Sequence, residues 1–161
     1  MTRRSRAREV ALQLLYQHDL NPRVERPVIE GFVRDRLRDP AVEPFTLGLY
    51  DGVLAHRPDI DRRLGAAAVN WRLPRMAAVD RNVLRLGGYE LLYNPQTPPG
   101  VALDEAIELA RRYGSAHSPG FVNGVLDRLH QQEKRKNEGS HGSEPQGHEE
   151  PRTENRERKT V

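Results

Sequence analysis

The chain has 161 residues, a formal net charge of +3 and a mean hydropathy of −0.79, a length that suits one domain. It contains no cysteine, which excludes disulfides, thiolate zinc sites and cysteine nucleophiles. No apolar run approaches the roughly 18 residues of a membrane span, and the arginine-rich start lacks the apolar core of a signal peptide. We therefore expect a cytoplasmic protein.

The last part of the chain differs sharply from the rest. Residues 131–160 contain no aliphatic, aromatic or methionine side chain, and their seven basic and seven acidic residues cancel. Such a segment cannot bury enough apolar surface to offset its conformational entropy. We predict a folded domain over residues 1–130 and a disordered polar tail over residues 131–161.

Prolines and glycines divide the folded part into segments of helix length, and no segment alternates like a strand. The pattern predicts an all-α fold of about seven helices. They are expected at residues 5–20, 27–37, 44–54, 58–68, 74–93, 101–114 and 118–129.

The helix expected at residues 5–20 carries a wide apolar arc. Its alanines, valine and two of its leucines recur at helical spacing, while Leu12 and Tyr16 fall on an adjoining flank. Only a narrow polar strip around Gln13 remains for solvent. This arrangement predicts a helix that is packed on two sides.

A glycine pair interrupts the helix expected at residues 74–93. Gly87 and Gly88 should each cost about 1 kcal/mol relative to alanine. Close approach of another helix would compensate for this cost, and a kink is the alternative. Gly114 is placed to end the next helix, and Ser118 is placed to begin the last one as its N-cap.

Catalytic patterns are scarce. Asp104 and Glu105 lie near a helix start, where acidic side chains suit the helix dipole, and Glu108 is spaced to pair with Arg111 or Arg112. The six histidines have no metal-ligand spacing, and no glycine-rich loop joins a strand to a helix. We predict no catalytic residue, no metal and no cofactor.

Three features suit binding. The arginine block at the start of the chain offers guanidinium groups for phosphates and for stacking on bases, although a solvated terminus is the alternative. Tyr16, two turns past this block, suits either a binding surface or the edge of the core. The third feature is the start of the last helix at Ser118, whose free N–H groups attract anions. There Asn123 suits a base edge or an ordinary polar surface.

Four segments, RAREVALQLLYQHD, VDRNVLRLGGYELLY, VALDEAIELARRYGS and FVNGVLDRL, occur in the order and spacing of the NusB family. The chain resembles these bacterial transcription antitermination factors over residues 5–130. The resemblance implies an all-helical fold of two three-helix bundles. It also implies binding to single-stranded boxA-like RNA of ribosomal RNA leaders, together with the ribosomal protein NusE, in the RNA polymerase antitermination complex.

The resemblance also implies roles for particular residues. The RNA-binding set comprises Arg3, Arg4, Arg6, Arg8, Tyr16, Ser118, Phe121 and Asn123. The surface that faces NusE comprises Asp80, Tyr16 and His117. Relatives often carry an acidic residue near His117 and a basic one near Gly120, so this chain departs from the family there.

Other functions and assemblies stay open at this point. NusB-like domains also occur in RNA cytosine-5 methyltransferases, so one alternative is an accessory RNA-binding domain of an rRNA methyltransferase system. A second is a purely structural interaction module whose arginines only solvate the surface. A homodimer is a further assembly that the resemblance allows, and it would hide the RNA surface.

Overall fold

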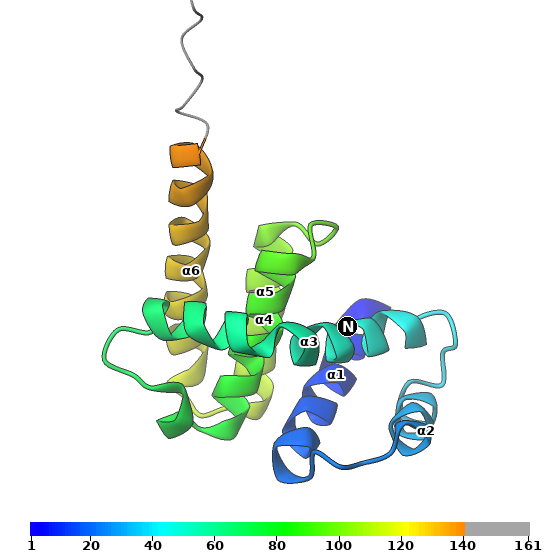
Figure 1. The fold of residues 1–161 in the computed structure, drawn as a ribbon. Coiled ribbons are helices and arrows are strands. Elements are labelled where there is room, and N and C mark those ends of the chain that lie inside the picture. Colours follow the sequence, from blue (N-terminus) through cyan, green and yellow to red (C-terminus); the bar gives the residue numbers. More distant parts are fainter. Residues whose placement is uncertain (141–161) are drawn as a thin grey trace, which may run out of the picture.

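The computed structural model describes residues 1–140, and this part of the chain is helical throughout. Its elements are α1 (Arg3–Leu20), α2 (Arg26–Leu37), α3 (Glu43–Ala67), the 3₁₀ helix η1 (Leu73–Arg75), α4 (Ala78–Tyr93), α5 (Pro99–Tyr113) and α6 (Ser118–Ser140) (Figure 1). The predicted all-α class is confirmed. None of these helices combines the length and the apolar character needed to cross a membrane.

The helices form two three-helix bundles that share one long element. α1, α2 and α3 pack against one another, as do α4, α5 and α6. Helix α3, with 25 residues, runs across both groups (Figure 1). Its second half packs against α4 and α6, where the Nε of Arg128 donates a hydrogen bond of 2.7 Å to the carbonyl oxygen of Ala67. The expected pair of bundles is therefore present.

Two predicted helix boundaries near Pro58 are wrong. The segments 44–54 and 58–68 form the single helix α3, with Pro58 inside it. Proline removes one intrahelical hydrogen bond and usually ends or kinks a helix. Here Val53 on one side of Pro58 and Ile60 and Leu64 on the other are fully buried in the same core, and this shared burial holds the helix together.

Two further boundaries also need correction. The helix expected from residue 74 begins at Ala78, after η1, and Arg81 ties α4 to this turn by donating hydrogen bonds of 3.3 and 3.4 Å to the carbonyls of Leu73 and Met76. Helix α6 continues to Ser140, ten residues beyond the expected end of the folded part. Glu133 on this extension accepts a hydrogen bond of 2.5 Å from Arg63 of α3. This charge pair holds the extension against α3, because the extension has no apolar side chains to bury. The rest of the predicted tail, residues 141–161, lies outside the described residues.

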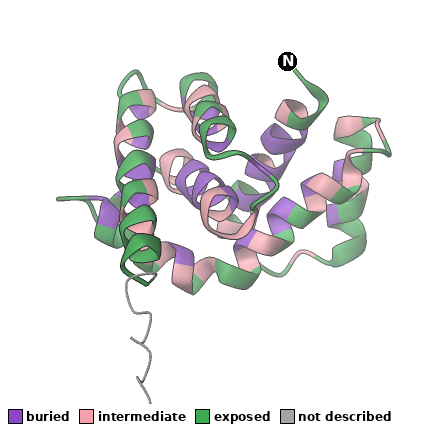
Figure 2. Ribbon diagram, turned by 90° about the horizontal axis from the view of Figure 1, so that it is seen from above, coloured by how far each residue is buried: buried purple, intermediate pink, exposed green. Residues whose placement is uncertain are grey.

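Helix α1 is packed on two sides, as its pattern predicted. It contacts α2 and α3 in its own bundle and α4 and α5 in the other, and its residues 7–12 are all buried (Figure 2). The glycine pair of α4 also fulfils its prediction. A Cβ atom on Gly87 would lie 2.7 Å from the Cδ1 of Leu126 and 3.2 Å from the Cβ of Ala106. Gly87 therefore lets α5 and α6 approach α4 closely, whereas a Cβ on Gly88 would make only ordinary contacts, with Ile60 of α3 at 3.4 Å and Leu129 of α6 at 3.6 Å.

Candidate nucleic-acid interface

The arginine block at the start of α1 is divided among different environments. Because successive residues of an α-helix are about 100° apart, neighbouring arginines point in different directions. Arg3 donates two hydrogen bonds, of 2.6 and 2.7 Å, to the carboxylate of Asp39. Arg4 is exposed, and its guanidinium lies 4.9 Å from the centre of the Phe45 ring. Both arginines keep guanidinium surface in contact with solvent.

Arg8 is not on the surface. Its side chain is 4% exposed, and its guanidinium donates two hydrogen bonds, of 2.7 and 2.9 Å, to the 2% exposed carboxylate of Glu90. This buried ion pair ties α1 to α4, and the remaining terminal nitrogen of Arg8, Nη1, lies 3.8 Å from the carboxylate of Glu105. Arg8 is therefore withdrawn from the expected RNA-binding set. Charged residues at the start of a chain suggest a solvated end, and the sequence gives no sign of the partner 82 residues away.

The Glu9 carboxylate accepts hydrogen bonds from side chains of two helices, α1 and α5. Its carboxylate, 6% exposed, lies 2.8 Å from Arg6 and 3.2 Å from Arg112, and the Tyr113 hydroxyl donates to it. Burial alone would raise the pKa of this carboxyl, but the hydrogen bonds hold its pKa below the ordinary value. Glu9 thereby fixes Arg6 of α1 beside Arg112 of α5, with both guanidinium groups more than one third exposed.

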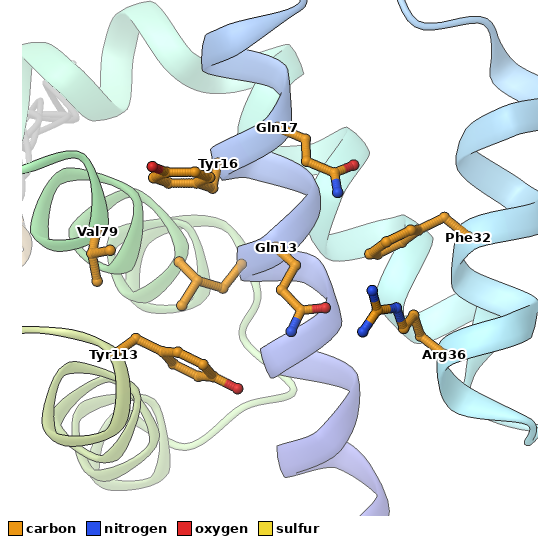
Figure 3. Close-up of a pocket in the computed structure, with 8 residues that line it drawn as sticks. Gln13, Tyr16, Gln17, Phe32, Arg36, Val79 and Tyr113 are labelled. Atoms are coloured by element: carbon orange, nitrogen blue, oxygen red, sulfur yellow. The ribbon is translucent and has the colours of Figure 1, made fainter.

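Tyr16 lies in a groove that runs over α1, here called the Tyr16 groove. Its volume is about 300 Å³. Figure 3 shows its walls, with Phe32 and Arg36 reaching in from α2 on one side and Tyr16 and Tyr113 on the other. The remaining lining residues are Leu12, Gln13, Gln17 and Val79. The polar strip that the sequence left to solvent is thus the floor of a groove.

A second groove, here called the Phe121 groove, lies at the start of α6 and has a volume of about 400 Å³. The 55% exposed ring of Trp71 meets the edge of Phe121 at 5.8 Å between ring centres. Asp80 and His117 also line this groove. Val79 of the Tyr16 groove and Asp80 of the Phe121 groove are consecutive in α4, and Tyr113 and Ser115 are a second such pair, two residues apart at the end of α5. The two grooves therefore flank the start of α4 and the end of α5.

Ser118 has a different role from the expected one. It is 2% exposed and lies inside the first turn of α6 rather than before it. Its Oγ accepts a hydrogen bond of 2.9 Å from the backbone N–H of Ser115, and thus holds the turn between α5 and α6. Ser118 lines the Phe121 groove, but its hydroxyl is engaged by Ser115 in this turn. Asn123, one turn further, is exposed.

The structure adds residues that the sequence did not single out. Trp71 lies between the helices expected at residues 58–68 and 74–93, and Phe32 lies within the helix expected at residues 27–37. Arg112 was regarded only as an ion-pair partner of Glu108, a pair that is present at 3.4 Å. An aromatic residue in a short loop is only a weak sign of a binding site. The position of Trp71 becomes informative once the structure shows α6 packed beside it.

Comparison with known proteins agrees with this geometry. The sequence model of the NusB family matches residues 5–131. The chain belongs to the NusB family. It is 46% identical over 129 residues to the transcription antitermination protein NusB of Sorangium cellulosum, covering 80% of this chain and 92% of that one. The NusB of Myxococcus xanthus is 41% identical, with 80% and 95% covered.

Solved structures of the NusB family share the fold. The NusB structure of T. maritima has a TM-score of 0.71 and 34% identity, and the match covers 84% of this chain and 98% of that one. A crystal structure of the antitermination factors NusB and NusE in complex with double-stranded RNA has a TM-score of 0.73 and 26% identity, with 82% and 98% covered. The expected membership of the NusB family is confirmed.

Proposed function

We propose that this protein is a transcription antitermination factor that binds boxA-type single-stranded RNA of ribosomal RNA leaders. In this proposal it acts in the cytoplasm together with the ribosomal protein NusE, as part of the RNA polymerase antitermination complex. Membership of the NusB family supports this function, as do relatives named for transcription antitermination. The related complex of NusB and NusE with RNA supports both kinds of partner. The mechanism is binding, with no bond made or broken.

The proposed RNA surface combines phosphate and base contacts. Arg3, Arg4 and Arg6 would hold phosphates, with Arg112 as an addition from the structure. Tyr16, Phe121 and Asn123 would touch unstacked bases, which is how proteins usually read single-stranded RNA. The observation that carries the proposal is that the Tyr16 groove and the Phe121 groove flank the start of α4, with Val79 lining one and Asp80 the other.

The two ends of this surface lie far apart along α1. Arg4 and Tyr16 are twelve residues apart, which corresponds to about 18 Å at 1.5 Å per residue. At about 3.4 Å per nucleotide, the rise of a stacked strand, about five nucleotides span that distance, and an extended, unstacked strand needs fewer. We therefore expect a dinucleotide, which cannot reach both ends, to bind weakly.

The proposed NusE-facing surface consists of Asp80, Tyr16 and His117. Asp80 and His117 line the Phe121 groove, and Tyr16 lies in the neighbouring groove. RNA and protein partners would thus contact adjoining parts of the same face. Such proximity explains why the two would bind together more tightly than either alone.

The test is an RNA-binding titration of the full chain with and without purified NusE. Three probes of equal length separate the possibilities: a single-stranded boxA-like RNA, a scrambled single strand and a duplex. We expect preference for the boxA-like single strand, enhanced by NusE. Equal and weak binding to all three, unaffected by NusE, would contradict the proposal. The molecular mass in solution must be measured alongside, since a homodimer would cover the RNA surface.

The accessory domain of an rRNA methyltransferase system is less well supported. The match to the antitermination relatives extends over 92% and 95% of their own lengths. A domain adapted to a methyltransferase has no reason to retain that likeness end to end.

A further inference from the structure

We propose that the Tyr16 groove is a pocket for a single unstacked nucleobase, with Gln13 as the residue that reads the edge of the base. This inference rests on the proposed RNA-binding function and extends it to Gln13, Phe32 and Arg36. None of these three residues belongs to the RNA surface proposed above.

The first observation is an unpaired acceptor on the floor of the groove. The Oε1 atom of Gln13 is buried and receives no hydrogen bond from any described residue. Buried polar atoms are nearly always paired, and leaving one unpaired is destabilising. In Figure 3 this oxygen turns toward Phe32 and Arg36, which line the same groove. Gln13 itself lines the groove, so a rotation of its amide would bring this oxygen to an N–H group of a ligand there and complete the pairing.

The second observation is the composition of the walls. Phe32, Tyr16 and Tyr113 offer aromatic rings, and the guanidinium of Arg36 lies 5.0 Å from the centre of the Phe32 ring. Aromatic rings and the flat guanidinium group are the surfaces on which unpaired bases stack. A glutamine amide carries one donor and one acceptor side by side, a pattern that matches the edge of a base.

Size and charge favour a base over other occupants. A volume of about 300 Å³ is at the small end of the range for ligand pockets, about 300–1,000 Å³, and suits one ring system. Of the eight lining residues, Arg36 alone is charged. The groove on the other flank of α1 is the opposite case, because it is lined by Glu9, Asp104, Glu105 and Glu108. A polyanionic strand would therefore be attracted to the Tyr16 groove.

The groove also continues the proposed phosphate surface. Arg6 stands seven residues before Gln13 on α1, which places both on nearly the same side of the helix. The Arg6 guanidinium donates a hydrogen bond of 3.4 Å to the carbonyl of Arg36. Glu9 holds Tyr113 at the rim of the groove. A strand whose phosphates lie at Arg6 would thus present its next bases to the groove.

The test is Gln13→Leu, which keeps the size of the side chain and removes the unpaired acceptor. If the groove holds a base, this variant should bind the boxA-like single strand about tenfold more weakly, within the range that one base contact provides. Its melting temperature should stay the same or rise, because an apolar side chain replaces a buried polar atom without a partner. A merely structural role for Gln13 would lower stability and binding together. Gln131→Leu, at an exposed position on α6, is the matched control and should change neither quantity.

A scan of the RNA makes the test independent of one variant. The boxA-like strand is prepared with an abasic site at each position in turn. With the unaltered protein, one position should stand out with a loss of about tenfold. With Phe32→Leu or Gln13→Leu, the same abasic site should cost little, because the contact is already lost.

The outcomes separate the two proposals. If the unaltered protein binds no RNA, the proposed function fails. If it binds RNA but Gln13→Leu and Phe32→Leu bind with unchanged affinity and an unchanged abasic profile, the base pocket fails while the function stands. If these variants weaken NusE binding in the absence of RNA and leave RNA binding intact, the groove holds a side chain of the protein partner, and the base pocket is refuted.

Discussion

The start of α1 and the start of α6 build binding surface in opposite ways. Four arginines crowd the first segment, yet the helix distributes them to separate places, and Arg8 enters the core. Residues 118–124 carry no charge at all, yet Trp71, Asp80 and His117 assemble around them. Charge that is concentrated in a sequence becomes spread by the helical period, whereas a nearly neutral segment can become the centre of a site through packing.

This contrast suggests that the two regions contact different parts of the RNA. Dispersed arginines suit phosphates, which repeat along every strand and carry no sequence information. A shaped aromatic groove suits bases, which differ in their edges. The start of α1 should therefore govern affinity and its dependence on salt, and the start of α6 should govern the choice of sequence.

The largest effect is expected from Arg8→Ala. The substitution leaves the buried carboxylate of Glu90 without its partner, which should lower the free energy of unfolding by about 3–5 kcal/mol. Urea unfolding followed by circular dichroism measures this loss. The double variant Arg8→Met with Glu90→Leu removes both charges and should recover most of it. A loss of unfolding free energy below about 1 kcal/mol for Arg8→Ala would mean that Arg8 is not buried in an ion pair with Glu90.

A smaller loss is expected at the turn that precedes α6. In Gly114→Ala the new Cβ would lie 2.4 Å from the Oγ of Ser118 and 2.7 Å from the carbonyl oxygen of Ala110. Overpacking of this kind usually costs about 1–3 kcal/mol. Gly120→Ala is the control, because nothing lies within 4 Å of its added Cβ and alanine favours a helix. Equal melting temperatures for the two variants would mean that the turn around Gly114 relaxes at no cost and is not tightly packed.

The double variant Arg4→Ala with Arg6→Ala should alter RNA binding and lower stability only slightly, because Arg112 and Tyr113 still pair with the Glu9 carboxylate. Loss of two phosphate contacts should reduce the salt slope by about 1.4, which corresponds to about 25-fold in affinity at 0.1 M salt. BoxA-like and scrambled strands should be affected alike. Titrations at several salt concentrations measure the slope. Arg62→Ala with Arg135→Ala, at exposed positions on α3 and α6, also removes two positive charges and is the matched control. An equal effect there would show that only net charge matters.

The smallest effect is expected from Asn123→Ala. Loss of one hydrogen bond to a base edge is worth about 1 kcal/mol, or about fivefold, and should appear only in the preference for the boxA-like over the scrambled strand. The salt slope should stay unchanged, because a base contact releases no counterions. Asn137→Ala, exposed near the end of α6, provides the comparison. A change in slope without a change in preference would place Asn123 beside a phosphate.

The sequence by itself determined the class of the fold and the character of its central helix. Apolar residues at a period of 3.6 predict α1 as a helix packed on two sides, and a glycine pair in α4 predicts close helix approach. Both conclusions hold because they depend on which residues face inward, and periodicity records that directly. The family motifs identified the family for a similar reason, since their spacing is a property of the chain.

Only the tertiary structure decided which side chains meet. The pairing of Arg8 with Glu90 joins residues 82 positions apart, and shared burial carries α3 through Pro58 against its local preference. The contact of Trp71 with Phe121, and the position of Phe32 opposite Gln13, likewise depend on how whole helices pack. Such contacts involve long-range burial and charge pairing, which leave no periodic trace in the sequence, and this is why the grooves became visible only in the folded chain.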